Sequence, residues 1–199
     1  YKTDKTVREL MADYIESIRA TASPSTIRGY ITIRDNRFQS VANKSADRIK
    51  NWQRVIDAEA DLTSAKTLKN AWGFLRTAMR HAGMTPPDVR LPQLVPPDKL
   101  WLEPDDILRF VKLLHGQPCE IPALLALHGL RRSEIFAMTY GKIDLRARTI
   151  TVHGAAVMDE HDKLIQKPTN KNASSRRVVP IMIPTLVDAL RAAPAHGPD

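Results

Sequence analysis

Residues 129–135 of the chain are Gly-Leu-Arg-Arg-Ser-Glu-Ile, which places an arginine directly after a helix-ending glycine. Arg131 follows an apolar stretch that predicts a helix, and Glu134 lies three residues further on. A carboxylate at this spacing can hold the guanidinium in a bidentate pair. A guanidinium that is held in one orientation can bind the oxygens of a phosphate group. The alternative interpretation is an ordinary surface arginine paired with a nearby glutamate.

A second basic residue, Lys171, lies in a polar, glycine-free loop over residues 167–175. The flanking segments 163–166 and 177–183 have the texture of short strands, so we expect a β-hairpin with Lys171 in its loop. Such a lysine can place its ammonium in a groove or on a leaving oxygen. Because a lone loop lysine is usually solvent-exposed, the specific signal is the two motifs together, in this order.

This order of motifs resembles the tyrosine recombinases, the phage-integrase family. Their catalytic domains carry a first arginine in a Gly-Leu-Arg-x-x-Glu motif and a lysine in the following β-hairpin. The resemblance implies that Arg131 is the first catalytic arginine, Glu134 the acidic residue that steadies the site, and Lys171 the general acid to the leaving 5′ hydroxyl. It gives Arg132 no catalytic role. It also implies a covalent 3′-phosphotyrosyl intermediate, which conserves bond energy and needs neither ATP nor metal.

The chain departs from the family pattern after Lys171. A His-x-x-Arg box, a further His or Trp and the tyrosine nucleophile should follow, but no tyrosine occurs after Tyr140. His128 and Arg131 themselves spell His-x-x-Arg, yet that box requires a tyrosine roughly 30 residues later, and Tyr140 is too close. We therefore interpret Arg131 as the first arginine, with His128 in place of a threonine common there. We expect this fragment to bind DNA without cutting it.

Four helices are predicted in residues 1–85. Thr6 followed by Glu9 forms a capping box, the second helix is expected to run to Phe38, and Gly83 ends the fourth. Trp52 and Trp72 occupy core-like helical positions, for which packing is favoured over base stacking. The expected helix caps, in chain order, are Thr6, Ser23, Ser45 and Ser64.

By the resemblance, these helices form a core-binding domain that crosses the major groove of DNA, and residues 64–71 are similar to the start of its last helix. A cation that contacts a phosphate releases condensed counterions and adds salt-dependent affinity. For any one of these cations, a solvated helix face is an equally good interpretation. The expected DNA contacts are Arg28, Arg34, Lys66, Lys69, Arg76 and Arg176.

Residues 86–97 are rich in proline and lack a helical period, so they predict an extended linker. We therefore expect a helical, SAM-like core-binding domain at 1–85 and a partial α+β catalytic domain at 98–199. The fold class is mainly α with a small antiparallel β-sheet. The elements expected after the linker, besides the hairpin, are helices at 104–114, 121–128, 134–138 and 186–192 and a strand at 149–152.

Composition narrows the partners of the 199-residue chain. Its formal charge of +8 and pI near 9.8 favour a polyanion, although an ordinary basic protein is an equally good interpretation of composition alone. The most apolar window, 121–130, is broken by His128 and is about half the ~20 residues that a membrane span needs. A single cysteine, Cys119, excludes an internal disulfide and favours a reducing cytosol.

The sequence lacks the residue patterns of metal sites and of nucleotide-binding phosphate loops. The histidines are scattered, without a His-Glu-x-x-His pattern or a cysteine pair, and no Gly-x-x-x-x-Gly-Lys loop occurs. We therefore expect no metal, no cofactor and no small-molecule substrate. The chain opens on Tyr1, which favours an excised fragment.

The function expected from these observations is that of a site-specific recombinase (integrase) of a phage or conjugative element, cytoplasmic and bacterial or phage-encoded. The resemblance implies a parent that acts on double-stranded DNA as a tetramer on paired sites, whereas this fragment is expected to be a monomer. The rival is a non-catalytic DNA-binding regulator on the same fold, in which Arg131 and Lys171 only hold phosphates. A downstream tyrosine discriminates the two. An RNA partner is disfavoured because no aromatic cluster is available for stacking on single strands.

Overall fold

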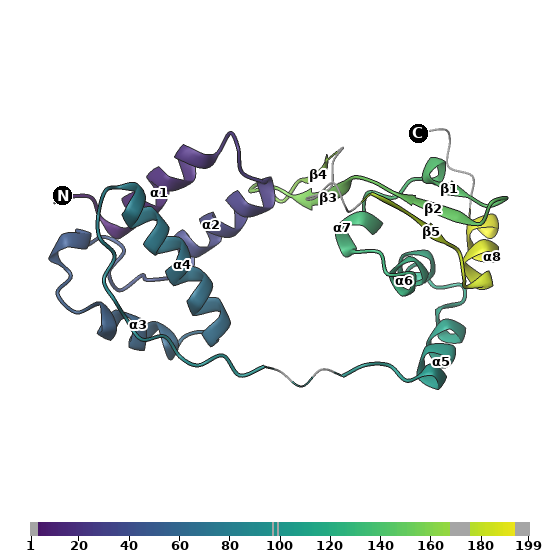
Figure 1. Cartoon of the computed structure of the whole chain (residues 1–199), viewed down its shortest axis with the longest axis horizontal. Coiled ribbons are helices and arrows are strands. Elements are labelled where there is room, and N and C mark those ends of the chain that lie inside the picture. Colours follow the sequence, from purple (N-terminus) through teal and green to yellow (C-terminus); the bar gives the residue numbers. More distant parts are fainter. Residues whose placement is uncertain (1–3, 97, 99, 168–175, 194–199) are drawn as a thin grey trace. The chain divides into compact units, whose positions relative to one another are not determined.

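The computed structural model describes residues 4–96, 98, 100–167 and 176–193. The chain divides into two compact units (Figure 1). The first contains Tyr1–Pro97 together with Met158–Lys163, and the second contains Asp98–Val157 and Leu164–Asp199. The mainly helical fold with a small antiparallel sheet, expected from the sequence, is confirmed.

Three α-helices of the first unit have N-termini capped by a side chain, whereas Ser23 occupies the N-cap position of the helix at Pro24 without a side-chain cap bond. The capping box of Thr6 and Glu9 is present, with the Thr6 backbone N–H donating to Glu9 Oε2 over 2.8 Å. Ser64 accepts a hydrogen bond from the backbone N–H of Thr67, as its position predicts. The helices are α1 (Val7–Ile18), α2 (Pro24–Asn36), the 3-10 turn η1 (Ala46–Arg48), α3 (Trp52–Ala60) and α4 (Ala65–His81).

Two sequence predictions about these helices are wrong. Ser45 caps no α-helix: it precedes η1 without a side-chain cap bond, and Asn51 caps α3 by accepting from the backbone N–H of Arg54. The second helix ends at Asn36 rather than Phe38. Arg37, directly after Asn36, is extended and ends the helix. Phe38 then has a left-handed φ of 56°, and the buried Glu59 accepts its backbone N–H over 2.7 Å.

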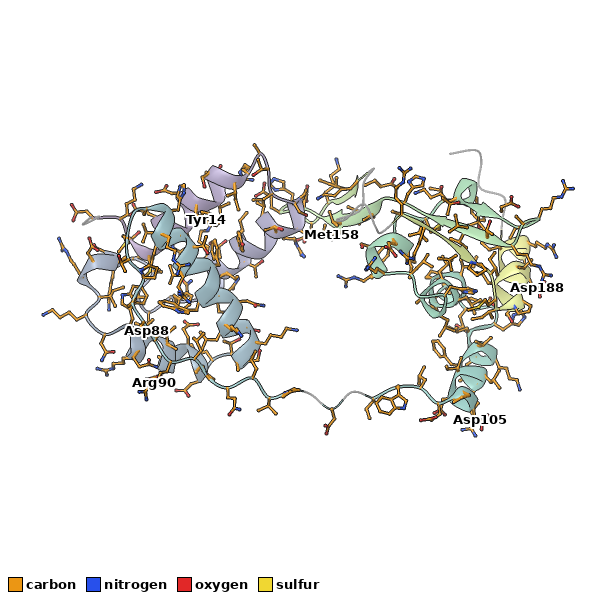
Figure 2. All side chains as sticks on the ribbon, viewed as in Figure 1. Tyr14, Asp88, Arg90, Asp105, Met158 and Asp188 are labelled. Carbon is orange, nitrogen blue, oxygen red and sulfur yellow. The ribbon has the colours of Figure 1, made fainter. Side chains whose placement is uncertain are left out.

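The core of the first unit lies between α1 and α4. Apolar residues at three and four residue steps on both helices are fully buried, among them Leu10 and Leu75. The expected packing role of Trp52 and Trp72 is confirmed, since both are buried with ring centroids 5.6 Å apart. Tyr14 packs beside the stacked pair of Tyr30 and Phe74 (Figure 2).

The chain after α4 is extended, and its first part belongs to the first unit. Met84, Val89 and Leu91 pack against the helical core. The side chain of Gln53 on α3 bonds both the carbonyl and the N–H of Arg90, over 3.1 Å and 2.8 Å (Figure 2). The described residues of 86–97 form no helix, as the prolines predict.

The second unit combines helices with short strands. Its three-stranded sheet has the order β1-β2-β5, and β5 pairs antiparallel to β2 with Ile150 opposite Val179. A separate pair consists of β3 and β4. The helices are α5 (Pro104–Leu114), α6 (Glu120–Leu127), α7 (Arg132–Ile135) and α8 (Pro184–Ala192), with the 3-10 turn η2 (Tyr140–Lys142). The strands are β1 (Ile143–Asp144), β2 (Thr149–Val152), β3 (Ala155–Met158), β4 (Leu164–Lys167) and β5 (Arg177–Pro180).

The predicted β-hairpin around residue 171 is wrong in its pairing. In the part of the chain that the structure describes, β4 pairs with β3, and β5 pairs with β2. The strands on either side of the loop are thus held by other partners. The core of this unit packs Leu124 of α6, Ile150 of β2 and Leu186 of α8 together, so the sheet and two helices fix the chain on both sides of residues 129–135.

Candidate functional site

The candidate site in the second unit is the turn between α6 and α7. Gly129 has a φ of 78°, a left-handed conformation that glycine adopts without strain. Its backbone reverses direction there, so that Leu130 is buried while Arg131 stays exposed. The sequence Gly-Leu-Arg therefore anchors the turn by an apolar side chain and presents the arginine immediately after it.

Glu134, whose side chain is 3% exposed, is the centre of the hydrogen-bond network at this turn. Its Oε2 accepts the backbone N–H of Arg131 over 2.9 Å, and its Oε1 accepts Nη1 of Arg131 over 2.9 Å. Arg177 on β5 donates Nη1 to Oε1 over 3.1 Å and Nη2 to Oε2 over 2.9 Å. One carboxylate thus joins the turn, the helix after it and a strand of the sheet.

These contacts set the ionisation of Glu134. Burial raises the pKa of its carboxyl, but the bonds donated by Arg177 and by the backbone and guanidinium of Arg131 outweigh burial and lower the pKa to about 2. The same pairing raises the pKa of Arg177. Glu134 is therefore a fixed negative charge at neutral pH, and it is occupied in holding guanidinium groups.

The guanidinium of Arg131 is held by a single hydrogen bond to Glu134. The expected bidentate pair with Glu134 is wrong for Arg131, which makes a single side-chain bond to the carboxylate. The bidentate partner is Arg177. The Arg131 side chain is 65% exposed, so its remaining N–H groups face solvent in an orientation that Glu134 limits. A guanidinium oriented in this way is suited to binding phosphate oxygens through two N–H donors.

Arg177 was not among the predicted site residues. Its Nη2 also donates to the Gly129 carbonyl over 3.1 Å, so the guanidinium ties the glycine turn to Glu134. The available signal was the alternation of β5, in which Arg177 and Val179 are partly buried and Val178 and Pro180 are exposed. An arginine on the inward side of a strand requires a buried acceptor, and Glu134 supplies it.

His128 is a second residue whose role the sequence did not indicate. It is buried, and its Nδ1 lies 2.7 Å from the Leu124 carbonyl. Its Nε2 accepts the backbone N–H groups of Met182 and Ile183, over 3.1 Å and 3.3 Å. This arrangement requires a neutral ring with its proton on Nδ1. Both ring nitrogens are occupied by backbone groups, so His128 fastens the end of α6 to the segment before α8.

Two predicted residues lie at or near the loop between β4 and β5. Lys171 lies outside the described residues. Arg176 directly precedes β5 and is exposed. Of the residues predicted for the catalytic site, the structure thus brings Arg131 and Glu134 together, and it adds Arg177 to them.

In the first unit, the predicted DNA contacts on α4 share one exposed face. Lys66, Lys69 and Arg76 are exposed and, within the described part of the chain, form no ion pair. Arg80 continues this face at the next helical step and was missed by the sequence prediction. Helix α4 contains no acidic residue. We call Lys66, Lys69, Arg76 and Arg80 the α4 stripe.

The two predicted contacts on α2 are paired with carboxylates instead. Arg34 donates Nε and Nη2 to Asp35 over 2.8 Å and 2.9 Å, and this pairing raises the pKa of Arg34. Arg28 pairs with Asp162, a residue of the same compact unit. Their charge is partly neutralised locally, in contrast with the α4 stripe.

Other kinds of site find little support among the residues that are described. No cluster of His, Cys, Asp and Glu there has the composition of a metal site. In the same residues, no helix combines the length and apolarity needed to cross a bilayer. Cys119 is exposed and unpaired.

The fold of this chain has counterparts among solved structures. No protein-family model matches the sequence. No curated protein matches it. Among solved structures, the chain is similar to the Tn1549 transposon integrase in complex with transposon right end DNA, with a TM-score of 0.75 and 20% identity over 94% of this chain and 64% of that one. It is also similar to that integrase in complex with circular intermediate DNA, with a TM-score of 0.75 and 21% identity over 98% of this chain and 67% of that one.

At this level of identity, the likeness shows the fold. The chain has the fold of the matching part of a DNA-bound transposon integrase, and it spans about two thirds of that protein's chain. This agrees with the resemblance to tyrosine recombinases that residues 129–135 carry in the sequence.

Proposed function

We propose that this chain is the DNA-binding portion of a site-specific tyrosine recombinase, an integrase of a mobile element, acting on double-stranded DNA. The observation that carries the proposal is the geometry of Arg131. Its guanidinium is exposed, it is oriented by the buried carboxylate of Glu134, and it follows a left-handed glycine turn. A likeness of fold to integrases bound to DNA supports the same conclusion.

In this proposal Arg131 binds the non-bridging oxygens of the scissile phosphate. Charge builds on these oxygens in the transition state, and a guanidinium already held in place stabilises it without reorganisation. Glu134 and Arg177 act through Arg131 and are positioning residues. Lys171 protonates the leaving 5′ hydroxyl, a role that rests on the family resemblance alone.

The α4 stripe contacts the DNA backbone in the same proposal. Its four exposed cations lie along one helix face with no acidic residue on the helix. Each phosphate neutralised in this way releases counterions, so binding through the stripe depends steeply on salt. The contacts position the protein on duplex DNA and carry no sequence information directly.

The tyrosine nucleophile and a second arginine belong, in this proposal, to a part of the fold that these 199 residues do not contain. The 199 residues alone are therefore expected to bind DNA as a monomer without cleaving it. The full protein is expected to work as a tetramer on paired sites, in the cytoplasm of a bacterium.

The test is covalent trapping with the complete reading frame that contains this chain. Nicked suicide duplexes drawn from the DNA beside the gene release the 5′-hydroxyl piece after cleavage and leave the protein attached to a 3′ phosphate. We expect an adduct whose formation drops at least 100-fold in Arg131→Gln. Arg132→Gln, a neighbouring exposed arginine outside the network, is the matched control and should retain activity.

A second candidate is a DNA-binding regulator on the same fold. The exposed cations of the α4 stripe favour it, because they can bind a duplex without any catalytic residue. Under this candidate, the complete frame binds the duplexes and forms no adduct. An adduct that is unaffected by Arg131→Gln would overturn the role given to Arg131 while leaving the recombinase assignment in place.

A further inference from the structure

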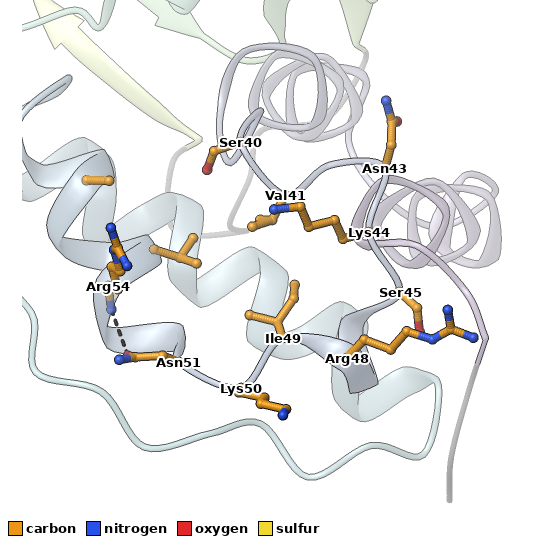
Figure 3. A pocket seen from close by; sticks show the side chains of 12 residues that line it. Ser40, Val41, Asn43, Lys44, Ser45, Arg48, Ile49, Lys50, Asn51 and Arg54 are labelled. Carbon is orange, nitrogen blue, oxygen red and sulfur yellow. Dashed lines mark hydrogen bonds between the residues drawn. The ribbon is translucent and has the colours of Figure 1, made fainter.

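The first unit contains an open pocket of about 860 Å³ between the segment that follows α2 and the helix α3 (Figure 3). One wall comes from residues 40–51, and the other comes from Arg54, Val55 and Ala58 of α3. None of the residues predicted to contact DNA lines it. We call this pocket the α3 groove.

The α3 groove is positively charged. Its lining contains Lys44, Arg48, Lys50 and Arg54 and no carboxylate. All four cations are exposed, and none makes an ion pair with another described residue. In Figure 3, Lys44 and Arg48 come from the segment after α2, while Arg54 comes from α3. Like charges gathered without counter-charges repel each other, and an anion bound among them relieves that repulsion.

Neutral hydrogen-bonding groups accompany these charges. Ser40 and Asn43 line the groove and are exposed. The Asn51 carbonyl oxygen is used to cap α3, which leaves its amide N–H groups for a ligand. Hydroxyl and amide donors beside lysine and arginine are the usual set of contacts to phosphate oxygens of a nucleic-acid backbone.

The apolar lining indicates which polyanion fits. Val41 and Val55 are 6% and 8% exposed, and no large exposed apolar side chain of the described residues lies in the groove. The groove therefore presents no aromatic or large exposed aliphatic side chain that could serve as the anchor of a protein interface. It also lacks an aromatic side chain for stacking on the bases of a single strand.

We propose that the α3 groove is a second DNA-backbone site, which binds the phosphates of a duplex by charge and is separate from the α4 stripe. The proposal rests on the proposed function, because it needs duplex DNA as the ligand. Its effect is to add phosphate contacts, without sequence preference, from a second duplex.

The test compares salt dependence for three variants of the 199-residue chain on a random duplex of about 40 base pairs. Each lost phosphate contact reduces the steepness of the plot of log K against log salt by about 0.9. The groove variant should therefore show a slope that is shallower by about 2 to 4, and it should bind the duplex roughly tenfold or more weakly. The groove variant carries Lys44→Gln, Arg48→Gln, Lys50→Gln and Arg54→Gln. The charge-matched control carries Arg109→Gln, Lys112→Gln, Arg146→Gln and Arg191→Gln, all exposed residues of the second unit.

The third variant, Lys66→Gln with Lys69→Gln, separates this proposal from the proposed function. Loss of affinity in this variant with none in the groove variant overturns the α3 groove alone. An equal loss in the groove variant and the charge-matched control also overturns it, since bulk charge then explains the effect. An unmutated chain that does not bind the duplex overturns both proposals.

A second measurement uses the unmutated chain. In amide NMR spectra, the duplex should shift the signals of residues 43–54 as well as those of α4. Poly-glutamate at equal charge should shift the signals of residues 43–54 less than the duplex does. Shifts there with poly-glutamate and none with the duplex would identify an acidic peptide as the ligand and overturn the proposal.

Discussion

The arginines around the Gly129 turn in the second unit and the cations of the α4 stripe in the first unit are held in opposite ways. In the second unit, Arg131 and Arg177 share the buried Glu134 and are fixed relative to the backbone. On α4, Lys66 and Lys69 extend into solvent with no carboxylate on the same helix. A fixed guanidinium suits a transition state of defined geometry, whereas mobile ammonium groups suit a uniform backbone of phosphates. Removing a charge should therefore damage folding and geometry at the Gly129 turn and only affinity on α4.

The largest expected effect comes from Glu134→Ala. Removing this carboxylate deprives the partly buried Arg177 of its negatively charged partner and frees the turn, so the second unit should lose about 3–5 kcal/mol of unfolding free energy. Chemical denaturation followed by circular dichroism measures it. Arg132→Ala, an exposed neighbour, should change stability by about 0.5 kcal/mol or less. Equal effects of the two substitutions would remove the distinction between fixed and mobile charges in this unit.

Acid should reproduce much of that loss in the unmutated chain. The pKa of Glu134 falls from 4.5 when unfolded to about 2 when folded, so its ionised form stabilises the fold above pH 4.5. This contribution, about 3 kcal/mol, is lost as the pH falls from 4.5 towards 2. Unfolding free energies measured across that window in the unmutated chain and in Glu134→Gln test it. Parallel pH profiles would contradict the pairing.

His128→Ala should cost less, about 2–3 kcal/mol, because it leaves the N–H groups of Met182 and Ile183 without their acceptor. His115→Ala is the control, since the His115 side chain is 84% exposed. Nitrogen NMR of the unmutated chain should show a neutral His128 protonated at Nδ1. A ring protonated at Nε2 would rule out the described hydrogen bonds.

The smallest effect on folding is expected on α4. Lys66→Gln and Lys69→Gln should each change stability by about 0.5 kcal/mol or less, as surface substitutions do. Each should lower the salt slope of duplex binding by about 0.9. Thermal unfolding and a fluorescence titration at several salt concentrations give both quantities. A stability loss comparable with that of Glu134→Ala would erase the contrast between the units.

The sequence predicts the helical part of the fold well because its signals are local. Thr6 and Ser64 cap their helices through residues three positions away, and the apolar spacing of α1 and α4 marks their buried faces. Ser45 and Asn51 are both residue types that cap helices, and the Asn51 side chain is the one that accepts a backbone N–H of α3. The pairing of β5 with β2 joins residues distant in the chain, so no local signal indicates it. The partner of β4 is the nearby β3, which the sequence pattern did not predict as a strand.

In the candidate site, too, the contacts between residues close in the chain were predicted and those between distant residues were not. Arg131 and Glu134 are neighbours along the chain, and their contact follows from helical spacing. Arg177 reaches Glu134 only because β5 lies beside β2, and the alternation of β5 was the only local signal that separates it from Arg176. The ring of His128 bonds backbone groups 54 and 55 residues away, which no motif encodes.

The most direct test of the central claim is a titration of the 199-residue chain with duplex DNA over a series of salt concentrations. It compares the unmutated chain, Lys66→Gln with Lys69→Gln, and the charge-matched pair Arg109→Gln with Lys112→Gln on α5. The account predicts binding whose salt slope falls by about 2 in the α4 variant and changes little in the α5 variant. No binding at low salt, or equal losses in the two variants, would contradict it.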